Sequence, residues 1–360
     1  MRSEQPVDVL IVSLGSTAGL RTADAELHDS LARAGARVAL ARALAPRPAR
    51  TLVLTDLGWA RAARTAAEGL LRQMRRSPPR ALLYSSTTAA LFWPRPGAIR
   101  FDAPASGNRP GHHGLWQRPL ERRRLAQASL VLPWSEGGLS EAPVSARSGE
   151  RALVLPVPVE PSGPLEPVRD IAAITYAANP SKKGLDRVLD AWRAVRGELT
   201  GKPDAGPDGT DTVGPEGFDG LVVAGISARE LSEMGFDLDG EEGVRVTGAL
   251  PPSEYRALVR RARVFVCAPR REDYGIAQLE ALADGCMLVS TPAPGPYAAL
   301  PIARELDARL ISDDLAGALR VALGEQQGDY AHRARDALAP FSREAVDRLV
   351  AQQLLARLLA

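Results

Sequence analysis

The chain has 360 residues, which is too long for one typical domain and comfortable for two, each able to bury its own core. Its 45% hydrophobic and 24% charged content is that of an ordinary globular protein, and no apolar run approaches the roughly 20 residues that a membrane span requires. The N-terminal residues lack a signal-peptide pattern, so we expect a cytoplasmic protein. Two cysteines, Cys267 and Cys286, are too few for a disulfide framework or a cysteine-based metal site, and we expect both in the core.

Positive charge is concentrated in the N-terminal half. Residues 1–157 contain 22 arginines against 12 acidic residues, although the net charge of the whole chain is only +2. Clusters such as Arg42, Arg47 and Arg50 could face an anionic ligand or the inner face of a membrane, where the protein would associate peripherally with anionic lipid. The basic residues comprise 42 arginines and only three lysines, which favours a general compositional bias. We do not expect nucleic acid as a partner.

Short apolar runs alternate with longer helical patterns through the N-terminal half. Strands are predicted at residues 7–13, 37–40, 81–84, 98–101 and 130–132, and a helix over residues 22–34 follows a glycine-containing turn. Such alternation is typical of βαβ units and predicts a parallel sheet. We therefore expect residues 1–157 to form one Rossmann-like domain.

A proline-rich segment, residues 158–168, then interrupts the pattern, and we interpret it as an interdomain linker. A second Rossmann-like domain is expected over residues 169–342. Residues 201–220 are rich in Gly, Pro and Asp, which predicts a flexible insertion. The chain closes with an amphipathic helix over residues 343–360, which could pack on either domain.

In the second domain, strands are expected at 171–176, 221–224, 244–247, 263–268 and 287–290, and helices at 185–196, 253–261 and 276–283.

The most informative segment runs from Arg270 to Gly285 and follows a predicted strand. It places Glu272 and Glu280 on either side of a helix start near Gly275. The free backbone N–H groups at that start, with the positive end of the helix dipole behind them, make a site for a diphosphate. The two carboxylates can accept hydrogen bonds from hydroxyls on either side of it. A ligand with a sugar on one side of a diphosphate and a ribose on the other fits this arrangement.

The segment from Glu272 to Glu280, with Tyr-Gly-Ile inside it, resembles the E-x7-E motif of family 4 (group 1) retaining glycosyltransferases. Two further segments, residues 176–186 and 246–250, resemble other parts of that family and occur in its order. The resemblance is firm over residues 171–297 and thin over the N-terminal half. It implies an α/β protein of the GT-B fold, in which two Rossmann-like doubly wound domains face each other across a cleft.

The same resemblance implies a nucleotide diphosphate sugar as the donor. Glu272 would bind hydroxyls of the transferred sugar, Glu280 the ribose diol, and Lys183 the diphosphate, whose negative charge grows as the glycosidic bond breaks. No metal ion and no other cofactor would be required. The other residues that the resemblance assigns to donor binding are Gly15, Lys182, Gly248, Leu250, Arg270, Arg271, Tyr274, Gly275 and Ile276.

One departure from the family's pattern concerns a cation. The family usually has an arginine a few residues before the lysine, where this chain has Ala177 and Ala178. Either Arg270 or Arg271 supplies the missing charge from the Glu272 loop, or the diphosphate is held less tightly.

The N-terminal domain would bind the acceptor. Asp102 follows a predicted strand, where the family often has a His or Asp facing the reacting carbon, so Asp102 would orient or polarise the acceptor. An aspartate that caps a turn before Pro104 is the other interpretation. Asn108, His112 and His113 lie in a loop rich in hydrogen-bonding groups and are candidate acceptor contacts. Two adjacent histidines without a nearby carboxylate make a poor metal site.

The expected function is therefore sugar transfer to an unidentified acceptor, with retention at the anomeric carbon. A non-catalytic nucleotide-sugar-binding module and a nucleotide-sugar epimerase on the same plan remain open. A dinucleotide-dependent oxidoreductase would need a G-x-G-x-x-G turn, which the segment from Gly15 to Gly19 does not supply.

Overall fold

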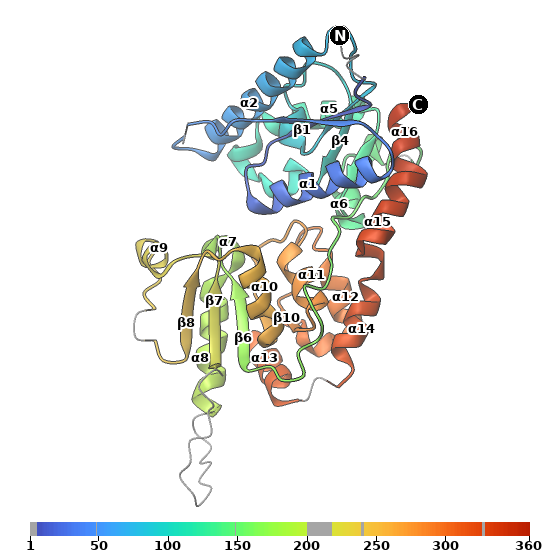
Figure 1. Cartoon of the computed structure of the whole chain (residues 1–360). Coiled ribbons are helices and arrows are strands. Elements are labelled where there is room, and N and C mark those ends of the chain that lie inside the picture. Colours follow the sequence, from blue (N-terminus) through green and yellow to red (C-terminus); the bar gives the residue numbers. More distant parts are fainter. Residues whose placement is uncertain (1–5, 48, 148, 200–217, 239–240, 326–327) are drawn as a thin grey trace, which may run out of the picture. The chain divides into compact units, whose positions relative to one another are not determined.

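The computed structural model describes residues 6–47, 49–147, 149–199, 218–238, 241–325 and 328–360 (Figure 1). The chain divides into two compact units. The N-terminal unit comprises Met1–Pro158 together with Pro340–Ala360, and the C-terminal unit comprises Val159–Ala339. Within the described residues, each unit contains its own five-stranded sheet.

The sheet of the N-terminal unit is parallel, with the strand order β2-β1-β3-β4-β5. Four of these strands are buried along most of their length, as expected where helices cover both faces of a parallel sheet. All the carboxyl ends lie along one edge of the sheet, because the strands run in the same direction. The strands are β1 (Val9–Ser13), β2 (Val38–Arg42), β3 (Ala81–Tyr84), β4 (Ala98–Phe101) and β5 (Val131–Pro133).

Side-chain caps start several helices of this unit. Thr17 and Thr51 accept hydrogen bonds from the first turns of α1 and α2, so α1 begins at Ala18, four residues before the expected start. The helical elements up to the linker are α1 (Ala18–Arg33), α2 (Leu52–Gln73), α3 (Thr87–Ala90), α4 (Ala105–Asn108), η1 (Gly111–Gly114), α5 (Gln117–Gln127), α6 (Glu136–Glu141) and η2 (Val144–Ala146).

The C-terminal end of the chain returns to the N-terminal unit. Here α15 (Arg343–Leu349) continues through a π-helical turn, η5 (Val350–Leu354), into α16 (Leu355–Leu359). The sequence left the partner of this amphipathic segment open, and the structure assigns it to the N-terminal unit. Its buried side chains belong to the same cluster as two leucines of α1: Val346, Val350, Leu354, Leu27 and Leu31.

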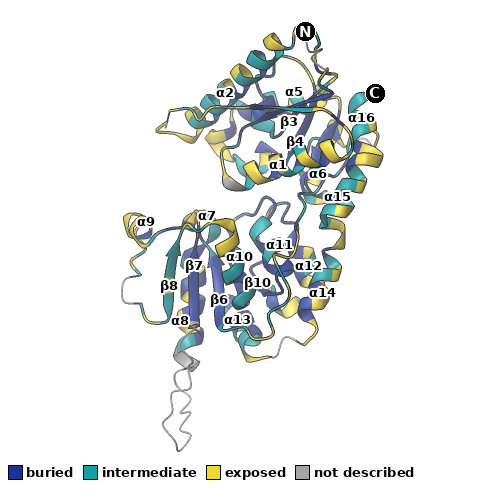
Figure 2. Ribbon diagram, viewed as in Figure 1, coloured by how far each residue is buried: buried dark blue, intermediate teal, exposed yellow. Residues whose placement is uncertain are grey.

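The sheet of the C-terminal unit is also parallel, with the order β10-β9-β6-β7-β8. The strand order reverses next to β6, which is the point where ligands bind in doubly wound folds. Figure 2 shows β6 and β7 as buried and β8, at the edge of the sheet, as partly exposed, with exposed residues on the outer faces of the helices. The strands are β6 (Ile171–Tyr176), β7 (Phe218–Ala224), β8 (Val244–Gly248), β9 (Ala262–Cys267) and β10 (Met287–Ser290). The helical elements are α7 (Pro180–Lys183), α8 (Leu185–Leu199), α9 (Ala228–Glu233), α10 (Pro252–Arg261), α11 (Ile276–Ala283), α12 (Ala299–Leu306), η3 (Ala308–Leu310), α13 (Leu315–Gly324) and α14 (Tyr330–Ala337), followed by η4 (Ala339–Phe341) where the chain passes into the N-terminal unit.

The doubly wound α/β fold expected for both halves is confirmed. The expected start of β7 was wrong: this strand begins at Phe218 and not at Leu221, because Phe218 pairs with Ile171 ahead of an irregularity in the register. The last three residues of the expected insertion therefore belong to a strand, and residues 200–217 lie outside the described residues. Cys267 and Cys286 are both buried, as expected. Within the described part of the chain, no helix combines the length and the apolar character needed to span a bilayer.

Candidate functional site

The start of α11 depends on Gly275. This residue caps the helix with a φ of +87°, a left-handed conformation that favours glycine. A Cβ atom at this position would also lie 2.9 Å from a ring carbon of the buried Tyr297. Because Gly275 has no side chain with which to cap the helix, the first backbone N–H groups of α11 point beyond its end, where the helix dipole is positive. They can bind an anion.

Glu272 lies just before this helix start and is 4% exposed. Its Oε2 atom accepts hydrogen bonds from Lys183 Nζ at 2.6 Å and from Gln278 Nε2 at 3.1 Å. Gln278 is 1% exposed, and its own Oε1 has no hydrogen-bond partner among the described residues. Lys183, Glu272 and Gln278, here called the Glu272 cluster, thus gather at the carboxyl edge of the sheet from α7, the β9–α11 loop and α11.

The next carboxylate, Asp273, binds the second lysine. Lys182 Nζ lies 2.8 Å from Oδ2 of Asp273, and Arg271 Nε lies 2.9 Å from Oδ1. Burial alone would raise the pKa of Asp273, but the two cations outweigh burial and hold that pKa below its ordinary value. Asp273 was not among the expected site residues, although it lies inside the E-x7-E segment.

Backbone packing brings the lysines to this loop. Asn179 caps α7 by accepting a hydrogen bond from Lys182 N at 3.0 Å. Gly184, with a φ of +66°, ends α7 so close to β9 that a Cβ atom would lie 1.9 Å from the carbonyl oxygen of Ala268. Arg270 N donates to the Lys182 carbonyl at 3.0 Å. The segment with both lysines is therefore fixed against the chain that leaves β9.

Glu280, the second glutamate of the motif, lies farther along α11. Its Oε1 atom is 3.3 Å from Arg256 Nη1 of α10, and its side chain is 27% exposed. Burial raises the pKa of Glu280, and the nearby Arg256 opposes that rise. Arg256 also binds the buried Asp284, with 2.6 Å between Nε and Oδ2. The sequence pattern does not point to Arg256, because this residue lies in α10, outside the motif from Glu272 to Glu280.

The two arginines considered as replacements for the missing cation bind carboxylates. Arg270 Nη2 lies 2.6 Å from Asp186 Oδ2, and Arg271 binds Asp273. Ala177 is one of the two alanines at the place where the family usually has an arginine. It is 1% exposed and follows β6 directly. Asp186 and Asp273 would therefore compete with a diphosphate for these two arginines.

The remaining donor candidates lie around the same edge of the sheet. Gly248 ends β8 with a φ of +77°, and its carbonyl accepts from Gly225 N at 2.9 Å. Leu250 follows in the turn before α10 and is partly buried. Tyr274 is 3% exposed, and Ile276, the first residue of α11, is partly buried.

In the N-terminal unit, the expected residues also follow strand ends. Gly15, with a φ of +58°, follows β1, and its carbonyl accepts from Arg21 Nη1 at 3.0 Å. Asp102 follows β4, and its Oδ1 accepts from Ala103 N at 2.8 Å, a turn-capping contact. Asn108 ends α4, while His112 and His113 are exposed in η1.

Two buried acidic residues near Asp102 were not predicted. Glu121 of α5 is 4% exposed, and its Oε1 accepts from Ala105 N at 2.8 Å, at the start of α4. Burial raises the pKa of Glu121 to about 7, against the lowering effect of hydrogen bonds from Thr87 and Ala105. Asp56 of α2 binds Arg109, with 2.7 Å between Oδ2 and Nε. Nothing local in the sequence distinguishes these two carboxylates from exposed ones.

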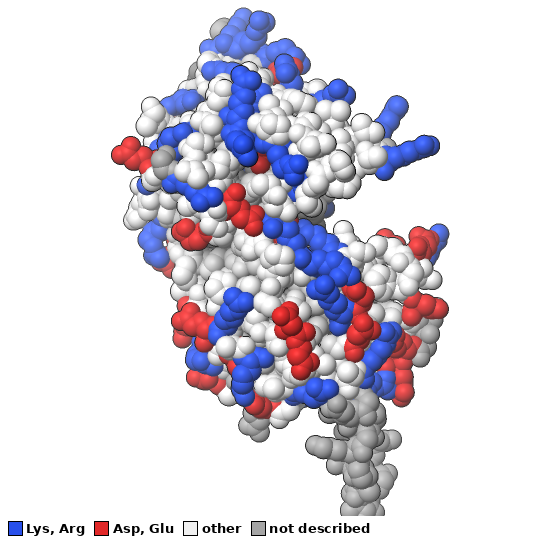
Figure 3. All heavy atoms as spheres, turned by 180° about the vertical axis from the view of Figure 1, so that it is seen from behind, with Lys and Arg blue, Asp and Glu red and all other residues white. Residues whose placement is uncertain are grey.

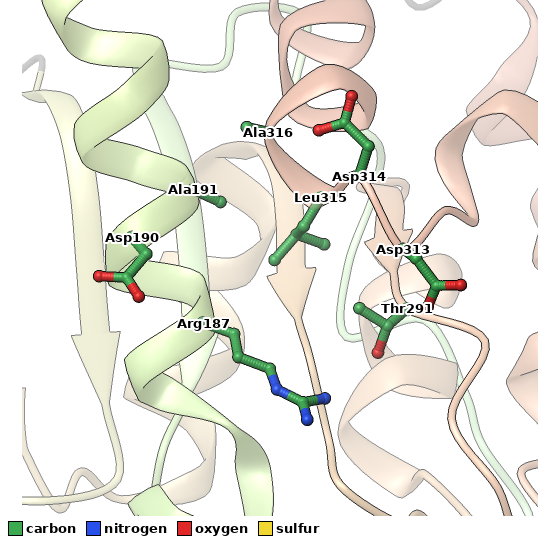
Figure 4. Close-up of a pocket in the computed structure, with 8 residues that line it drawn as sticks. All are labelled: Arg187, Asp190, Ala191, Thr291, Asp313, Asp314, Leu315 and Ala316. Carbon is green, nitrogen blue, oxygen red and sulfur yellow. The ribbon is translucent and has the colours of Figure 1, made fainter.

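A pocket of about 530 Å³ opens in the C-terminal unit between the first turns of α8 and α13 (Figure 4). Its charged lining residues are Arg187, Asp190, Asp313 and Asp314, and Thr291 lies beside them. None of the expected donor residues lines it. Within the described ranges, no group of three or more His, Cys, Asp and Glu side chains could hold a metal ion.

A protein-family model matches the C-terminal unit. The family is described as Glycosyl transferases group 1, and the match covers residues 171–323. That range contains Lys183, Glu272 and Glu280. No curated protein sequence matches the chain significantly.

Solved structures match almost the whole chain at low sequence identity. WaaG, a glycosyltransferase involved in lipopolysaccharide biosynthesis, is 14% identical with a TM-score of 0.64, over 95% of this chain and 99% of WaaG. The chain has the GT-B fold. Anabaena HepE, in complex with UDP and glucose, is 14% identical with a TM-score of 0.62, over 97% and 99% of the two chains. An E. coli trehalose-6-phosphate protein bound with UDP-2-fluoro glucose is 13% identical with a TM-score of 0.64, over 97% and 99%. These matches extend the GT-B plan to both units and confirm the expected fold.

Proposed function

We propose that this protein is a retaining glycosyltransferase that moves a sugar from a nucleotide diphosphate sugar to an acceptor hydroxyl without a metal ion or other cofactor. The observation that carries the proposal is the Glu272 cluster beside the Gly275-capped start of α11. It brings together an anion-binding helix end, a cation from α7 and a buried carboxylate at one edge of the sheet. The family match over residues 171–323 supports sugar transfer.

Donor binding would require Lys183 to exchange partners. Its ammonium group binds Glu272 directly at 2.6 Å, and a diphosphate at the start of α11 would compete for it. The sugar hydroxyls would then donate to Glu272 and replace that lost contact. Glu280, farther along α11, would accept hydrogen bonds from the ribose diol. The sugar would thus bind Glu272, while the nucleotide would bind Lys183 and Glu280. Only a nucleotide sugar would bind all three side chains.

The chemical step breaks the bond between the anomeric carbon and the diphosphate oxygen, and its electron pair stays on the diphosphate. Lys183 and the N–H groups of α11 would stabilise that charge. The acceptor oxygen forms the new bond on the same face of the anomeric carbon, and its proton passes to the departing diphosphate oxygen. We propose that the acceptor binds the N-terminal unit, where Asp102 would orient the hydroxyl and the loop with Asn108, His112 and His113 would contact the rest of it.

The structural neighbours supply a starting point for the donor. HepE was solved with UDP and glucose, and the E. coli protein with UDP-2-fluoro glucose. We therefore propose a UDP-sugar as the first donor to test.

Thermal stabilisation by a panel of nucleoside diphosphates and nucleotide sugars tests the donor site. A ligand that binds only the folded state at 100 times its Kd should stabilise it by about 2.7 kcal/mol. Glu280→Gln and Lys183→Ala should abolish the shift, whereas Glu254→Gln, a change at an exposed residue of α10, should retain it. If no nucleotide stabilises the protein, or if all three variants respond alike, the donor site is elsewhere or absent.

Product analysis separates the alternatives. A binding module would bind the nucleotide sugar without hydrolysing or transferring it, and an epimerase would convert the sugar with no acceptor present. For a retaining transferase, NMR of the product should show the anomeric configuration of the donor. The inverted configuration would exclude retention.

A further inference from the structure

Three of the five exposed large apolar side chains among the described residues of the N-terminal unit lie within eleven residues of each other in the sequence. Leu44 is 84% exposed, Leu54 is 52% exposed and Leu52 is 42% exposed. Single exposed leucines are common on protein surfaces, but a local group marks a contact surface. These leucines lie on the segment that connects β2 to α2 and on the first turn of α2, here called the β2–α2 segment (residues 43–54).

Contacts of the described residues, 43–47 and 49–54, keep the leucines on the surface. Thr51 caps α2 by accepting from Leu54 N at 3.3 Å, which fixes Leu52 and Leu54 in the first helical turn. Pro46 packs on the side of the same helix, so closely that a Cβ atom at Gly58 would lie 3.0 Å from its Cβ. The leucines are therefore exposed in a segment that is folded against α2.

Charge on the segment has one sign. The β2–α2 segment contains Arg47 and Arg50 and no acidic residue, and Arg42 directly precedes it; the next acidic residue along the chain is Asp56 in α2. That aspartate is 5% exposed and is neutralised by Arg109. Arg47 and Arg50 are exposed and form no ion pair with a described residue. Figure 3 shows basic side chains projecting from an otherwise largely uncharged edge of the N-terminal unit.

We propose that the β2–α2 segment docks on an anionic membrane surface. Exposed leucines beside unpaired arginines suit the boundary between headgroups and acyl chains, because the leucines leave water there and the arginines approach lipid phosphates. A nucleic acid would use the arginines but not the leucines, and a purely apolar protein partner would leave the arginines unpaired. Docking at this surface does not depend on the proposed transferase activity.

The β2–α2 segment is also connected to the candidate acceptor loop. The ion pair between Asp56 and Arg109 joins the second turn of α2 to the loop that contains Asn108, His112 and His113. Docking would therefore hold that loop close to the lipid surface.

Co-sedimentation of the full chain with vesicles tests the proposal. We expect binding to phosphatidylcholine vesicles that contain phosphatidylglycerol, little binding to phosphatidylcholine alone, and a loss of binding as salt rises. Replacing Arg47 and Arg50 by serine should weaken binding about 5-fold for each arginine removed. Leu44→Ser combined with Leu54→Ser should weaken it as well, although the charge is unchanged.

The matched control replaces Arg75 and Arg76 by serine. Both are exposed arginines of the same unit beyond the end of α2, so this variant has the same net charge as the Arg47 and Arg50 variant. It should bind vesicles like the wild type, and all variants should keep the wild-type melting temperature. Equal weakening in the control would show a general charge effect and overturn the proposal. Vesicle binding that is unaffected by the leucine changes would also overturn it. So would a dimer, seen by sedimentation velocity, that dissociates only when the leucines are changed.

Discussion

Two donors of different kinds hold Glu272 in place. Lys183 brings a charge that a diphosphate can also use, whereas Gln278 brings a neutral amide that is 1% exposed and remains beside the carboxylate throughout. The amide is oriented through its nitrogen, which donates to Glu272 Oε2 and to Cys267 Sγ, since its own Oε1 lacks a partner among the described residues. We therefore propose Gln278 as a positioning residue, which would keep Glu272 aligned when Lys183 turns to the donor.

Gln278→Leu tests this role. The change removes the amide's hydrogen bonds to Glu272 and to the Cys267 thiol, and also an unsatisfied buried oxygen, so the melting temperature should change little. Catalysis should fall by roughly 10-fold, the equivalent of about 1.4 kcal/mol, while the affinity for UDP alone stays near the wild-type value. Gln278→Asn should recover part of the loss if the amide matters. Equal losses in UDP affinity and in turnover would indicate a general disturbance of α11.

The sequence indicated the residues of the site but not their contacts. Glu272, Glu280 and Lys183 were found because a fixed spacing within a helix start or a loop is local information. Asp273 and Arg256 were missed because their contacts join segments far apart in the chain, such as α10 with α11. Gln278 was missed because the residues around it in α11 are mostly apolar, and nothing in that pattern shows that the glutamine is buried.

At the scale of elements, α5 and α4 are coupled through a carboxyl group. Glu121 of α5 accepts the hydrogen bond of Ala105 N at the start of α4. Its pKa of about 7 in the folded protein exceeds the ordinary value of 4.5. The folded state therefore binds this proton more tightly than the unfolded state. The resulting stabilisation is complete below about pH 4.5 and is lost as the pH rises through about 7.

Glu121→Gln should remove this pH dependence, because the amide keeps an acceptor oxygen but cannot ionise. The variant should gain stability over the wild type as the pH is raised from about 5 to about 8, by up to about 3 kcal/mol. Chemical denaturation at several pH values measures the difference. Glu150→Gln, at an exposed residue of the same unit, should show no such trend. A constant difference between Glu121→Gln and the wild type would contradict the raised pKa.

The helix that ends the chain is anchored to α1 by both apolar and charged contacts. Leu354 is 0% exposed, and Arg33 Nε of α1 lies 2.6 Å from Asp347 Oδ2. Leu354→Ala should lower the free energy of unfolding by about 2 to 5 kcal/mol, as expected for a buried leucine, whereas Gln352→Ala should have almost no effect because Gln352 is exposed. Urea denaturation monitored by circular dichroism measures both. Similar small changes would mean that this helix does not stabilise the N-terminal unit.

Element types were easier to predict than their ends. The strands β3, β4, β6 and β10 have the bounds that the sequence predicted, because short apolar runs between turn residues indicate buried parallel strands well. The starts of α1 and β7 were missed because a threonine cap and strand pairing at Phe218 decide them. Such boundaries depend on hydrogen bonds that a periodic pattern does not encode.

Across the whole molecule, the sequence predicted two doubly wound units but not the polar groups within them. Arg100 of β4 is 1% exposed, donates to the Ala23 carbonyl at 3.1 Å and lies over the ring of Trp134 at 4.9 Å. Asp24 of α1 binds Ser13 and Ser85, and burial raises its pKa. A buried arginine and aspartate depend on three-dimensional neighbours, so neither could be distinguished from the many surface charges of this arginine-rich chain.

The division into two units makes the donor assignment testable over the whole chain at once. If UDP binds at the Glu272 cluster, hydrogen exchange should slow most in the C-terminal unit, at the start of α11 and in the segment from Asn179 to Leu185, because the ligand's contacts reduce local opening. Protection in the N-terminal unit should be smaller, since UDP lacks the transferred sugar and no acceptor is present. Hydrogen exchange measured by mass spectrometry with and without UDP gives this comparison, and Glu254→Gln is its control. Protection centred on β1, α1 and the Gly15 turn would move the nucleotide to the N-terminal unit and remove the role proposed for Glu280.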